Sequence, residues 1–373
     1  MSARWPEKTV LGPPASTLGC GHAISPGQRG PRTHRYSAVP APCASFPRPV
    51  TTRTHIIIVN YRTPDLAIQA VASVEPQRAE LAGGRVILLD NASGDGSPQR
   101  LAHAVQERGW SDWVDVLPQP RNGGFSYGNN RGFDRVRELG DFGRAHLLLL
   151  NPDAQLEPGV LASALHHLQS HPRVGIVGVP SRSGAGQEAC CSAHQWPSPL
   201  SELLSQAKLG VLSRLLPRHE ISPPMREDSF FCDWVSGAFF LIRAEVAAQL
   251  GDMDEGYFLY FEEVDYCRRA AQHGWQTLLA AGPGILHWEG SSTGIADVAG
   301  VRPAYWYDSR RRFLIRHYGY TGLLLSDALS LFGRALYLPR KWLRLGAAGG
   351  GDAQPRHYHR RMLASDLKAL LGR

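Results

Sequence analysis

Three short apolar runs, each followed abruptly by polar side chains, constrain the fold more than any other feature of this sequence. The runs span residues 55–59, 85–89 and 146–150, and the polar residues that follow them are Asn60 with Tyr61, Asp90, and Asn151 with Asp153. Apolar runs of this length are typical of strands buried on both faces of a parallel sheet. The sequence therefore predicts a doubly wound, mostly parallel α/β sheet flanked by helices, with ligands at the carboxyl ends of the strands.

Helical patterns and weaker strand patterns fill the connections between these runs. Pro64 lies in the first turn of a predicted helix in which Leu66, Ala70 and Val74 share one face. The remaining predicted elements are strands at residues 116–118, 174–179 and 234–242, and helices at residues 157–167 and from residue 244. This alternation of strands and helices is what a doubly wound sheet requires.

The charge of this chain of 373 residues is unevenly distributed along its length. Residues 56–309 carry 20 basic and 29 acidic side chains, whereas residues 310–373 carry 13 basic and 3 acidic ones. An acidic middle argues against a nucleic-acid partner, whose groove would need a basic surface on the core of the fold. The basic C-terminal end suits peripheral contact with an anionic membrane surface.

Three regions follow from composition and pattern. Residues 1–54 are basic, rich in proline and glycine and without periodicity, and we predict that they are disordered. Residues 55–300 form the predicted α/β domain, and residues 301–373 a basic helical extension. The six cysteines form no CxxC pair, which predicts reduced thiols in a cytosolic protein. We expect no signal peptide and no transmembrane helix, since no apolar stretch is long enough for one.

Two interpretations of the C-terminal extension remain open. A helix is predicted from Tyr305 to His317, and residues 323–338 then place leucines on most helical faces ahead of a basic cluster around Trp342. Such a segment suits a helix that lies in a membrane interface. It equally suits a packed helical hairpin that covers the domain. A last basic helix is predicted from Arg356 to Leu371.

Polar loops follow two of the predicted strands, and an acidic residue follows a third. The first loop runs from Asp90 to Ser97, and its leading aspartate is either the start of an Asx turn or an acceptor for a nucleobase or ribose. The second runs from Arg121 to Gly132 without a GxGxxG pattern, which argues against a dinucleotide-dependent oxidoreductase. Asp153 is either a cap or a ligand for Mg²⁺ or Mn²⁺.

The stretch MDEGYFLYFEEVDYCRRAAQHGW, residues 253–275, concentrates acidic and aromatic side chains. Its helical pattern begins at Glu262, and Asp265 pairs with Arg269 one turn later. The predicted buried face consists of Val264, Cys267 and Ala271. The acids either follow the preference of a first helical turn for negative charge, or include a general base, Glu263 or its neighbour.

Five motifs occur in the order found in the family 2 glycosyltransferases: VNY, LLDNASGDGS, NGGFSYGNN, LLLNPD and the block from Trp234 to His287. The chain resembles these inverting nucleotide-sugar enzymes of the GT-A fold, and most of all their bacterial rhamnosyltransferase-like branch, over residues 55–320. No single motif is decisive, but five in register are specific.

The resemblance implies a nucleotide-sugar site. In the family the aspartate that matches Asp90 binds the nucleobase, and the one that matches Asp153 belongs to the metal motif, whose first acid is replaced here by Asn151. His287 would contact the divalent cation, Mg²⁺ or Mn²⁺, or the diphosphate. The residues implied to bind the nucleotide are Asn60, Tyr61, Asp90, Asn91, Ser93, Gly124, Asn130 and Asp153.

The resemblance also implies a base. Glu263 stands where the family has the aspartate of its Glu-Asp base motif, and the additional methylene would shift the carboxylate by about 1 Å. Glu262 and Asp265 would orient this base or bind the acceptor.

The implied reaction transfers a sugar, L-rhamnose from dTDP-L-rhamnose, to a hydroxyl of a cell-surface polysaccharide or lipid-linked glycan precursor. Such an enzyme would be cytoplasmic and peripheral on the inner face of the cytoplasmic membrane. One alternative is another donor, such as UDP-galactofuranose or UDP-glucose. The other is a catalytically silent nucleotide-sugar-binding or scaffold protein, because the metal motif and the base motif both depart from the family pattern.

Overall fold

The computed structural model describes residues 52–183, 192–219, 221, 226–288, 301–343, 355 and 357–371. The predicted disorder of residues 1–54 therefore falls almost entirely outside the described residues, as do four of the six cysteines. The other two, Cys232 and Cys267, are free thiols.

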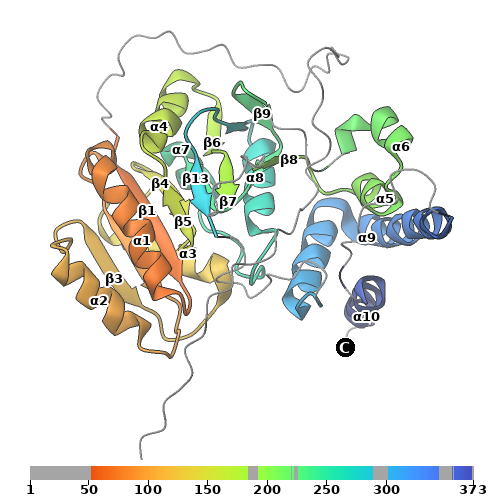
Figure 1. Cartoon of the computed structure of the whole chain (residues 1–373), viewed down its shortest axis with the longest axis horizontal. Helices are drawn as coiled ribbons and strands as arrows, with labels where there is room; N and C mark the ends of the chain where they lie inside the picture. The colour runs from red at the N-terminus through yellow and green to blue at the C-terminus, as the bar shows by residue number, and fades with distance from the viewer. Residues whose placement is uncertain are drawn as a thin grey trace, which may run out of the picture. The chain divides into compact units, whose positions relative to one another are not determined.

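An eight-stranded mixed sheet forms the core of the fold (Figure 1). Its strands, in spatial order, are β3 (Val114–Pro118), β2 (Val86–Asp90), β1 (Thr54–Asn60), β4 (His146–Leu150), β11 (Phe239–Ile242), β6 (Val174–Gly178), β12 (Gln276–Leu279) and β9 (Phe230–Cys232). The pairs β3–β2, β2–β1, β1–β4 and β6–β12 are parallel. Strand β11 runs antiparallel to both of its neighbours, and β9 is antiparallel to β12. The predicted mostly parallel α/β sheet is confirmed.

Helices cover both faces of this sheet because its strands alternate their side chains between two cores. In β1, Ile56 and Ile58 belong to one hydrophobic cluster, and Ile57 and Val59 to another. The first cluster includes side chains of α1 (Pro64–Val74), α2 (Ser97–Glu107) and α4 (Val160–Ser170). The second includes side chains of α3 (Gly124–Glu138), α7 (Ala244–Leu250) and α8 (Glu262–Gln272). Burial on both faces explains why the strands are continuous apolar runs.

Two small sheets lie outside the main one. They consist of β5 (Ala154–Leu156), β13 (Ile285–His287) and β7 (Ser181–Ser183), and of β10 (Trp234–Val235) and β8 (Ala193–His194). The prediction of one strand over residues 234–242 is wrong, because a turn at residues 236–238 divides it between β10 and β11. Short 3₁₀ segments, η1 (Glu75–Leu81) and η2 (Pro217–His219), complete the connections.

Helix α8 begins at Glu262, as predicted, but its buried face is different. Val264 and Cys267 are buried, whereas Ala271 is exposed and Ala270 takes its place. Ala270, three residues after Cys267, faces the sheet, and Ala271, four residues after it, does not. Both spacings lie near one helical turn of 3.6 residues, so the sequence pattern alone could not distinguish them.

The C-terminal extension is helical. Its longest helix is α9 (Ala304–Trp342), interrupted by non-helical dihedral angles at Gly319, and it packs on α5 (Pro199–Ala207) and α10 (Tyr358–Leu370), with α6 (Gly210–Leu215) following α5 (Figure 1). One face of α9 is thus packed, as the hairpin interpretation requires. Among the described residues, no helix combines the length and hydropathy needed to cross a membrane.

A buried arginine joins these helices. Arg310, which is 1% exposed, donates hydrogen bonds to Glu202 of α5 at 2.9 Å and to Asp327 in the second half of α9 at 3.0 Å. Asp366 of α10 lies 3.4 Å from the same guanidinium. Burial and the neighbouring Asp327 raise the pKa of Asp366 to about 7. Three elements far apart in sequence therefore depend on one cation.

We expect Arg310→Met to lower the free energy of unfolding by about 3–5 kcal/mol, because it leaves buried carboxylates without their counter-ion. Chemical denaturation followed by circular dichroism measures this change. Arg214→Met on α6, where the side chain is exposed, is the matched control and should change stability by less than about 0.5 kcal/mol. Equal stability of the two variants would show that the cluster does not hold the helices together.

Candidate active site

The carboxyl ends of β1 and β2 place Asn60 and Asp90 side by side, since the two residues are partners in the parallel register. Asn60 Nδ2 donates to Asp90 Oδ1 at 2.8 Å, and Ser93 Oγ donates to the same oxygen at 2.6 Å. The backbone N–H of Ser93 donates to Asp90 Oδ2 at 3.0 Å. All three side chains are buried. The carboxylate thus organises its own loop, as the Asx-turn interpretation requires, while Oδ2 retains acceptor capacity.

Positive φ angles at non-glycine residues occur at these two strand ends, before α8 and at three other places. Seven non-glycine residues have positive φ among the described residues. Two of them, Arg62 and Ala92, follow β1 and β2, and two more, Tyr260 and Phe261, directly precede α8. Left-handed backbone at bulky residues is costly and concentrates at functional sites. This distribution marks the ends of β1 and β2 and the start of α8 as candidate parts of the site.

The start of α3 forms a wall beside these strand ends. Asn91 Nδ2 donates to Asn122 Oδ1 and to the carbonyl of Gly124, both at 3.0 Å. Gly124 has a φ of 88°, and a Cβ there would clash with the carbonyl oxygen of Phe258, which accepts the N–H of Phe125 at 2.7 Å. Glycine is therefore required at this close approach. The buried Oδ1 of Asn91 has no hydrogen-bond partner within the described parts of the chain.

Two other residues predicted to bind the nucleotide have different surroundings. The Asn130 side chain donates to the carbonyl of Met253 at 2.9 Å and to Glu255 at 3.1 Å, and accepts the N–H of Met253 at 2.9 Å. Because both of its donors are used inside the protein, Asn130 positions the loop before α8. Tyr61 is half-buried, with the guanidinium of Arg62 5.1 Å from the centre of its ring.

The structure brings Asp153 and His287 together. Strand β13 pairs with β5 so that His287 lies opposite Ala154, and His287 Nε2 is 3.2 Å from Asp153 Oδ1. The same nitrogen is 3.4 Å from the side-chain amide of Asn151. Asp153 is 2% exposed. The rest of the predicted histidine motif, residues 289–293, lies outside the described residues.

This pair can hold a divalent cation. One carboxylate and one imidazole suit Mn²⁺ or Mg²⁺ and leave most of the coordination sphere to phosphate oxygens and water. Over the described residues there is no larger cluster of histidine, cysteine and acidic side chains that could hold a metal ion. The donor set thus fits a cation that is shared with a phosphate ligand.

Glu262 and Glu263 are adjacent carboxylates in the first turn of α8. Glu262 is buried and Glu263 is half-buried, and in each the oxygen Oε2 has no hydrogen-bond partner among the described residues. Burial raises the pKa of Glu263 to about 7, although hydrogen bonds from backbone N–H groups oppose the rise. Burial and the charge of Glu263 raise the pKa of Glu262 further. Within the pair, Glu263 is therefore the residue that ionises more readily near neutral pH.

The carboxylate of Asp265 is bonded to other side chains of the protein. It accepts hydrogen bonds from Arg269 at 2.9 Å and His317 at 2.8 Å, and Arg316 lies 3.2 Å away. Burial would raise the pKa of Asp265, but the bond to His317 and the two arginines outweigh it and lower that pKa. The predicted Asp265–Arg269 pair is confirmed. The α9 partners, Arg316 and His317, belong to no motif and could not be found from the sequence.

A glycine turn connects the base candidate to the metal donors. A Cβ at Gly237 would lie 3.9 Å from the Cβ of Glu263 and 3.8 Å from the ring of Phe125. The next residue, Ala238, accepts the N–H of Asn151 at 3.1 Å through its carbonyl. The start of α8, the start of α3 and the end of β4 thus meet around this turn.

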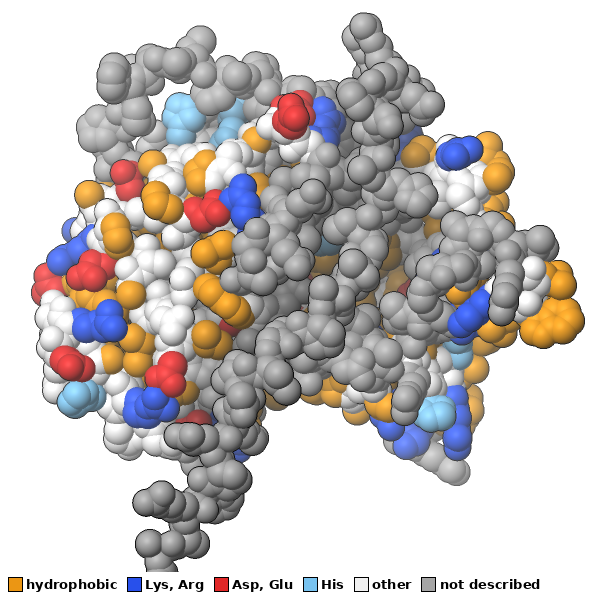
Figure 2. All heavy atoms as spheres, viewed as in Figure 1, with side chains coloured by type: hydrophobic (Ala, Val, Ile, Leu, Met, Phe, Trp, Pro, Cys, Tyr) orange, Lys and Arg blue, Asp and Glu red, His pale blue; other side chains and the backbone are white. Residues whose placement is uncertain are grey.

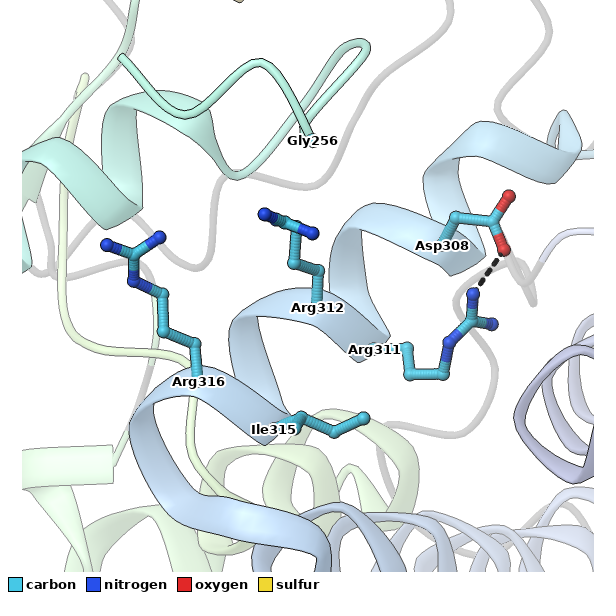
Figure 3. A pocket seen from close by; sticks show the side chains of 6 residues that line it. All are labelled: Gly256, Asp308, Arg311, Arg312, Ile315 and Arg316. Atoms are coloured by element: carbon cyan, nitrogen blue, oxygen red, sulfur yellow. Dashed lines mark hydrogen bonds and ion pairs between the residues drawn. The ribbon is translucent and has the colours of Figure 1, made fainter. Parts of the chain in front are cut away.

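A pocket of about 410 Å³ lies behind the loop that precedes α8 (Figure 3). It is lined by Gly256, Asp308, Arg311, Arg312, Ile315 and Arg316, none of which is a predicted site residue. Its arginines form ion pairs, Arg311 with Asp308, and Arg312 and Arg316 with Asp254. The ion pairs of Arg312 and Arg316 with Asp254 therefore connect α9 to this loop.

Comparison with known proteins identifies the family of the chain. A family model described as glycosyltransferase like family 2 matches residues 53–306. The N-acetylglucosaminyl-diphospho-decaprenol L-rhamnosyltransferase of Mycobacterium tuberculosis is 30% identical over 299 residues, which are 77% of this chain and 89% of that protein. The rhamnosyltransferase WbbL of Escherichia coli K12 is 26% identical over 152 residues, 40% of this chain and 55% of that protein.

Among solved structures, a mannosyltransferase of Pyrobaculum calidifontis in complex with GDP-mannose and Mn²⁺ superposes with a TM-score of 0.50 at 14% sequence identity, over 90% of this chain and 92% of that one. This likeness concerns the fold. The chain belongs to glycosyltransferase family 2, and it is a glycosyltransferase with the GT-A fold.

Proposed function

We propose that the enzyme transfers L-rhamnose from dTDP-L-rhamnose, with inversion of the anomeric centre, to a hydroxyl of a lipid-linked glycan precursor. The observation that carries the reaction type is the carboxylate pair at the start of α8. Its half-buried member, Glu263, has a pKa of about 7 and an unpartnered oxygen among the described residues. A base with a pKa near the working pH is the most effective at accepting a proton.

The different environments of Glu262 and Glu263 give the two side chains different roles in this proposal. Burial and the neighbouring charge of Glu263 raise the pKa of Glu262, which favours the protonated form of Glu262. Glu263 accepts the proton of the acceptor hydroxyl as the hydroxyl oxygen bonds to the anomeric carbon. The bond from that carbon to the diphosphate breaks in the same displacement, and its electron pair leaves with the nucleotide. Attack opposite the leaving group inverts the anomeric centre.

The strand ends hold the donor in this proposal. The acceptor capacity that remains at Asp90 Oδ2 suits an N–H or O–H donor of a nucleoside. Asp153 and His287, beside Asn151, would hold Mg²⁺ or Mn²⁺, which when bound neutralises charge on the departing diphosphate. Because Asn151 replaces an acid, the protein brings one negative charge less to this cation than the usual family motif would.

The choice of donor and acceptor is supported by the relatives, two of which are named as rhamnosyltransferases. The name of the mycobacterial relative describes an acceptor that carries a sugar on a diphospho-decaprenol lipid. A lipid-linked acceptor would place the reaction at a membrane surface. A donor panel of dTDP-L-rhamnose, UDP-galactofuranose and UDP-glucose, assayed for nucleotide diphosphate release with and without Mn²⁺, tests this choice. Nucleotide binding without turnover of any donor would favour a catalytically silent protein.

Glu263→Gln should keep the shape of the site and donor binding but lower turnover by about 10²-fold or more, because an amide accepts no proton. Glu263→Asp should retain partial activity, and Glu262→Gln should cost less than Glu263→Gln, because the raised pKa of Glu262 already favours its neutral form. Steady-state kinetics of the three variants, with a melting curve for each, separates the base from a helix-cap role. Full activity of Glu263→Gln would remove the base assignment.

The pKa of Glu263 also predicts opposite pH dependences of activity and stability. Turnover at low substrate should fall by about tenfold per pH unit below pH 7, because only the carboxylate is active. A raised pKa in the folded state stabilises the protonated native form, so the stabilisation is present below the unfolded pKa of about 4.3 and is lost as pH rises to about 7. The melting temperature of Glu263→Gln relative to the parent should therefore rise between pH 5 and pH 8. If the difference in melting temperature between Glu263→Gln and the parent were the same from pH 5 to pH 8, the raised pKa of Glu263 would be contradicted.

Asp153→Ala should abolish the Mn²⁺-dependent part of nucleotide diphosphate binding, since it removes the only carboxylate of the donor pair. Asp90→Ala is the matched comparison, because it should weaken nucleotide binding equally with and without the metal. Calorimetric titration of dTDP into each variant, with Mn²⁺ and with a chelator, measures both effects. Metal-dependent affinity that survives in Asp153→Ala would exclude Asp153 from the site.

A further inference from the structure

The second half of α9, residues 320–342, has its polar side chains inside and its apolar side chains outside. Its buried residues are Gly322, Leu323, Ser326, Asp327, Ser330, Gly333 and Tyr337. Its exposed residues from position 324 onward are Leu324, Leu325, Ala328, Leu331, Phe332, Ala335, Leu338, Pro339, Lys341 and Trp342. A helix on the surface of a soluble protein normally has the opposite arrangement.

The protein itself fixes this orientation. Asp327 faces inward because it pairs with Arg310 at 3.0 Å, and the Oγ of Ser330 lies 3.2 Å from Nε2 of His359 on α10. Gly333 lies against α5, where a Cβ would come within 2.7 Å of the carbonyl oxygen of Leu203. A rotation of the helix about its axis would expose or break these contacts. These inward contacts therefore keep the apolar face of α9 directed outward.

The outward face forms one continuous stripe. Leu324, Leu331 and Leu338 recur every seven residues and are 53%, 39% and 48% exposed. Phe332 is 55% exposed and Trp342 is 83% exposed. From Leu324 to Trp342 the stripe is about 27 Å long at 1.5 Å per residue. Contiguous apolar surface of this kind marks a docking site for another molecule or a membrane.

Charge selects a lipid surface as the occupant. The only acid of the segment, Asp327, is buried and paired with Arg310. Three basic residues lie near Trp342: Lys341 is exposed, Arg334 is half-buried, and Arg340 is half-buried and donates to the carbonyls of Ala207 and Lys208 at 2.9 and 3.3 Å. In the view of Figure 2, hydrophobic and basic side chains gather over α6 and the C-terminal end of α9. An amphipathic helix with basic residues beside an apolar stripe and a terminal tryptophan suits the interface of an anionic membrane.

The outward face of α10 has the same character. Its exposed apolar residues are Leu363, Leu367 and Leu370, and its exposed basic residues are Arg360, Arg361 and Lys368. Two copies of such surfaces would bring like charges together, which disfavours self-association relative to binding of anionic lipid headgroups.

We propose that the outward stripe of α9, from Leu324 to Trp342, inserts into the headgroup region of an anionic membrane and holds the enzyme there. This deepens the proposed function, on which it rests for its purpose, by naming the surface that meets the lipid in which a lipid-linked acceptor resides. The first half of α9 contacts α8 through His317 and Asp265, so the docked helix is connected directly to the helix that carries Glu263.

The test is co-sedimentation of the full chain with vesicles of phosphatidylcholine containing phosphatidylglycerol, compared with phosphatidylcholine alone. The triple variant Leu324→Gln/Leu331→Gln/Phe332→Gln should bind the anionic vesicles at least about tenfold more weakly, because it removes the centre of the inserted stripe. Val301→Gln, a change of an exposed apolar residue outside α9, is the matched control and should bind normally. High salt should weaken binding of the parent protein.

Melting curves keep the test decisive, because glutamine at exposed helical positions should leave folding intact. Equal vesicle binding by the triple variant and the parent would overturn the proposal. Loss of a parent dimer in the triple variant, measured by sedimentation velocity, without vesicle binding by the parent would identify a second copy as the occupant and also overturn it. Nucleotide release from dTDP-L-rhamnose with a water-soluble acceptor should be equal in the triple variant and the parent. If neither the parent nor the triple variant released nucleotide, that result would count against the proposed function alone, since vesicle binding is measured without a donor.

Discussion

The buried carboxylate of Asp265 is the interaction on which the arrangement of the candidate site depends. It lies on the helix that carries Glu262 and Glu263, and its ion pair with Arg316 and its hydrogen bond with His317 attach that helix to α9. Because a buried charge is stable only with its partners in place, the acidic helix and the C-terminal helices have to fold together. Arg310 extends the same principle to α5 and α10, with a cation at the centre instead of an anion.

The two acidic clusters show how environment separates residues of one chemical type. Asp265 is surrounded by cations and has a lowered pKa, whereas Glu263, two residues earlier, has a pKa of about 7 because desolvation raises it and, among the described residues, no cation opposes the rise. The helix dipole acts on both and cannot explain the difference. What differs is the number of positive partners. One acid is therefore structural and the other is available for proton transfer.

Much of this could be predicted from the sequence, where local pattern carries the information. Strands with two buried faces are continuous apolar runs, so β1, β2 and β4 and the polar residues at their ends were recognisable, as was the start of α8 at Glu262. The division of residues 234–242 between two sheets was not, because it depends on distant pairing partners: β10 pairs with β8, whereas β11 pairs with β4 and β6. The role of Asn130 was equally hidden, since its partners lie 123 and 125 residues away. Pairings over such distances leave no periodic signal.

Gly319 determines the angle between the two halves of α9. It is the one residue of the 39-residue α9 with non-helical dihedral angles, with φ 69° and ψ −179°. The angle between the half that contacts Asp265 and the half that carries the apolar stripe is thus set by a single joint. If the apolar stripe docks on a membrane, as we propose, an acceptor in that membrane diffuses in two dimensions, and a helix with one joint would hold Glu263 at a nearly constant height above that plane. Such an arrangement would raise the effective concentration of the acceptor near Glu263 without any added contact to the sugar.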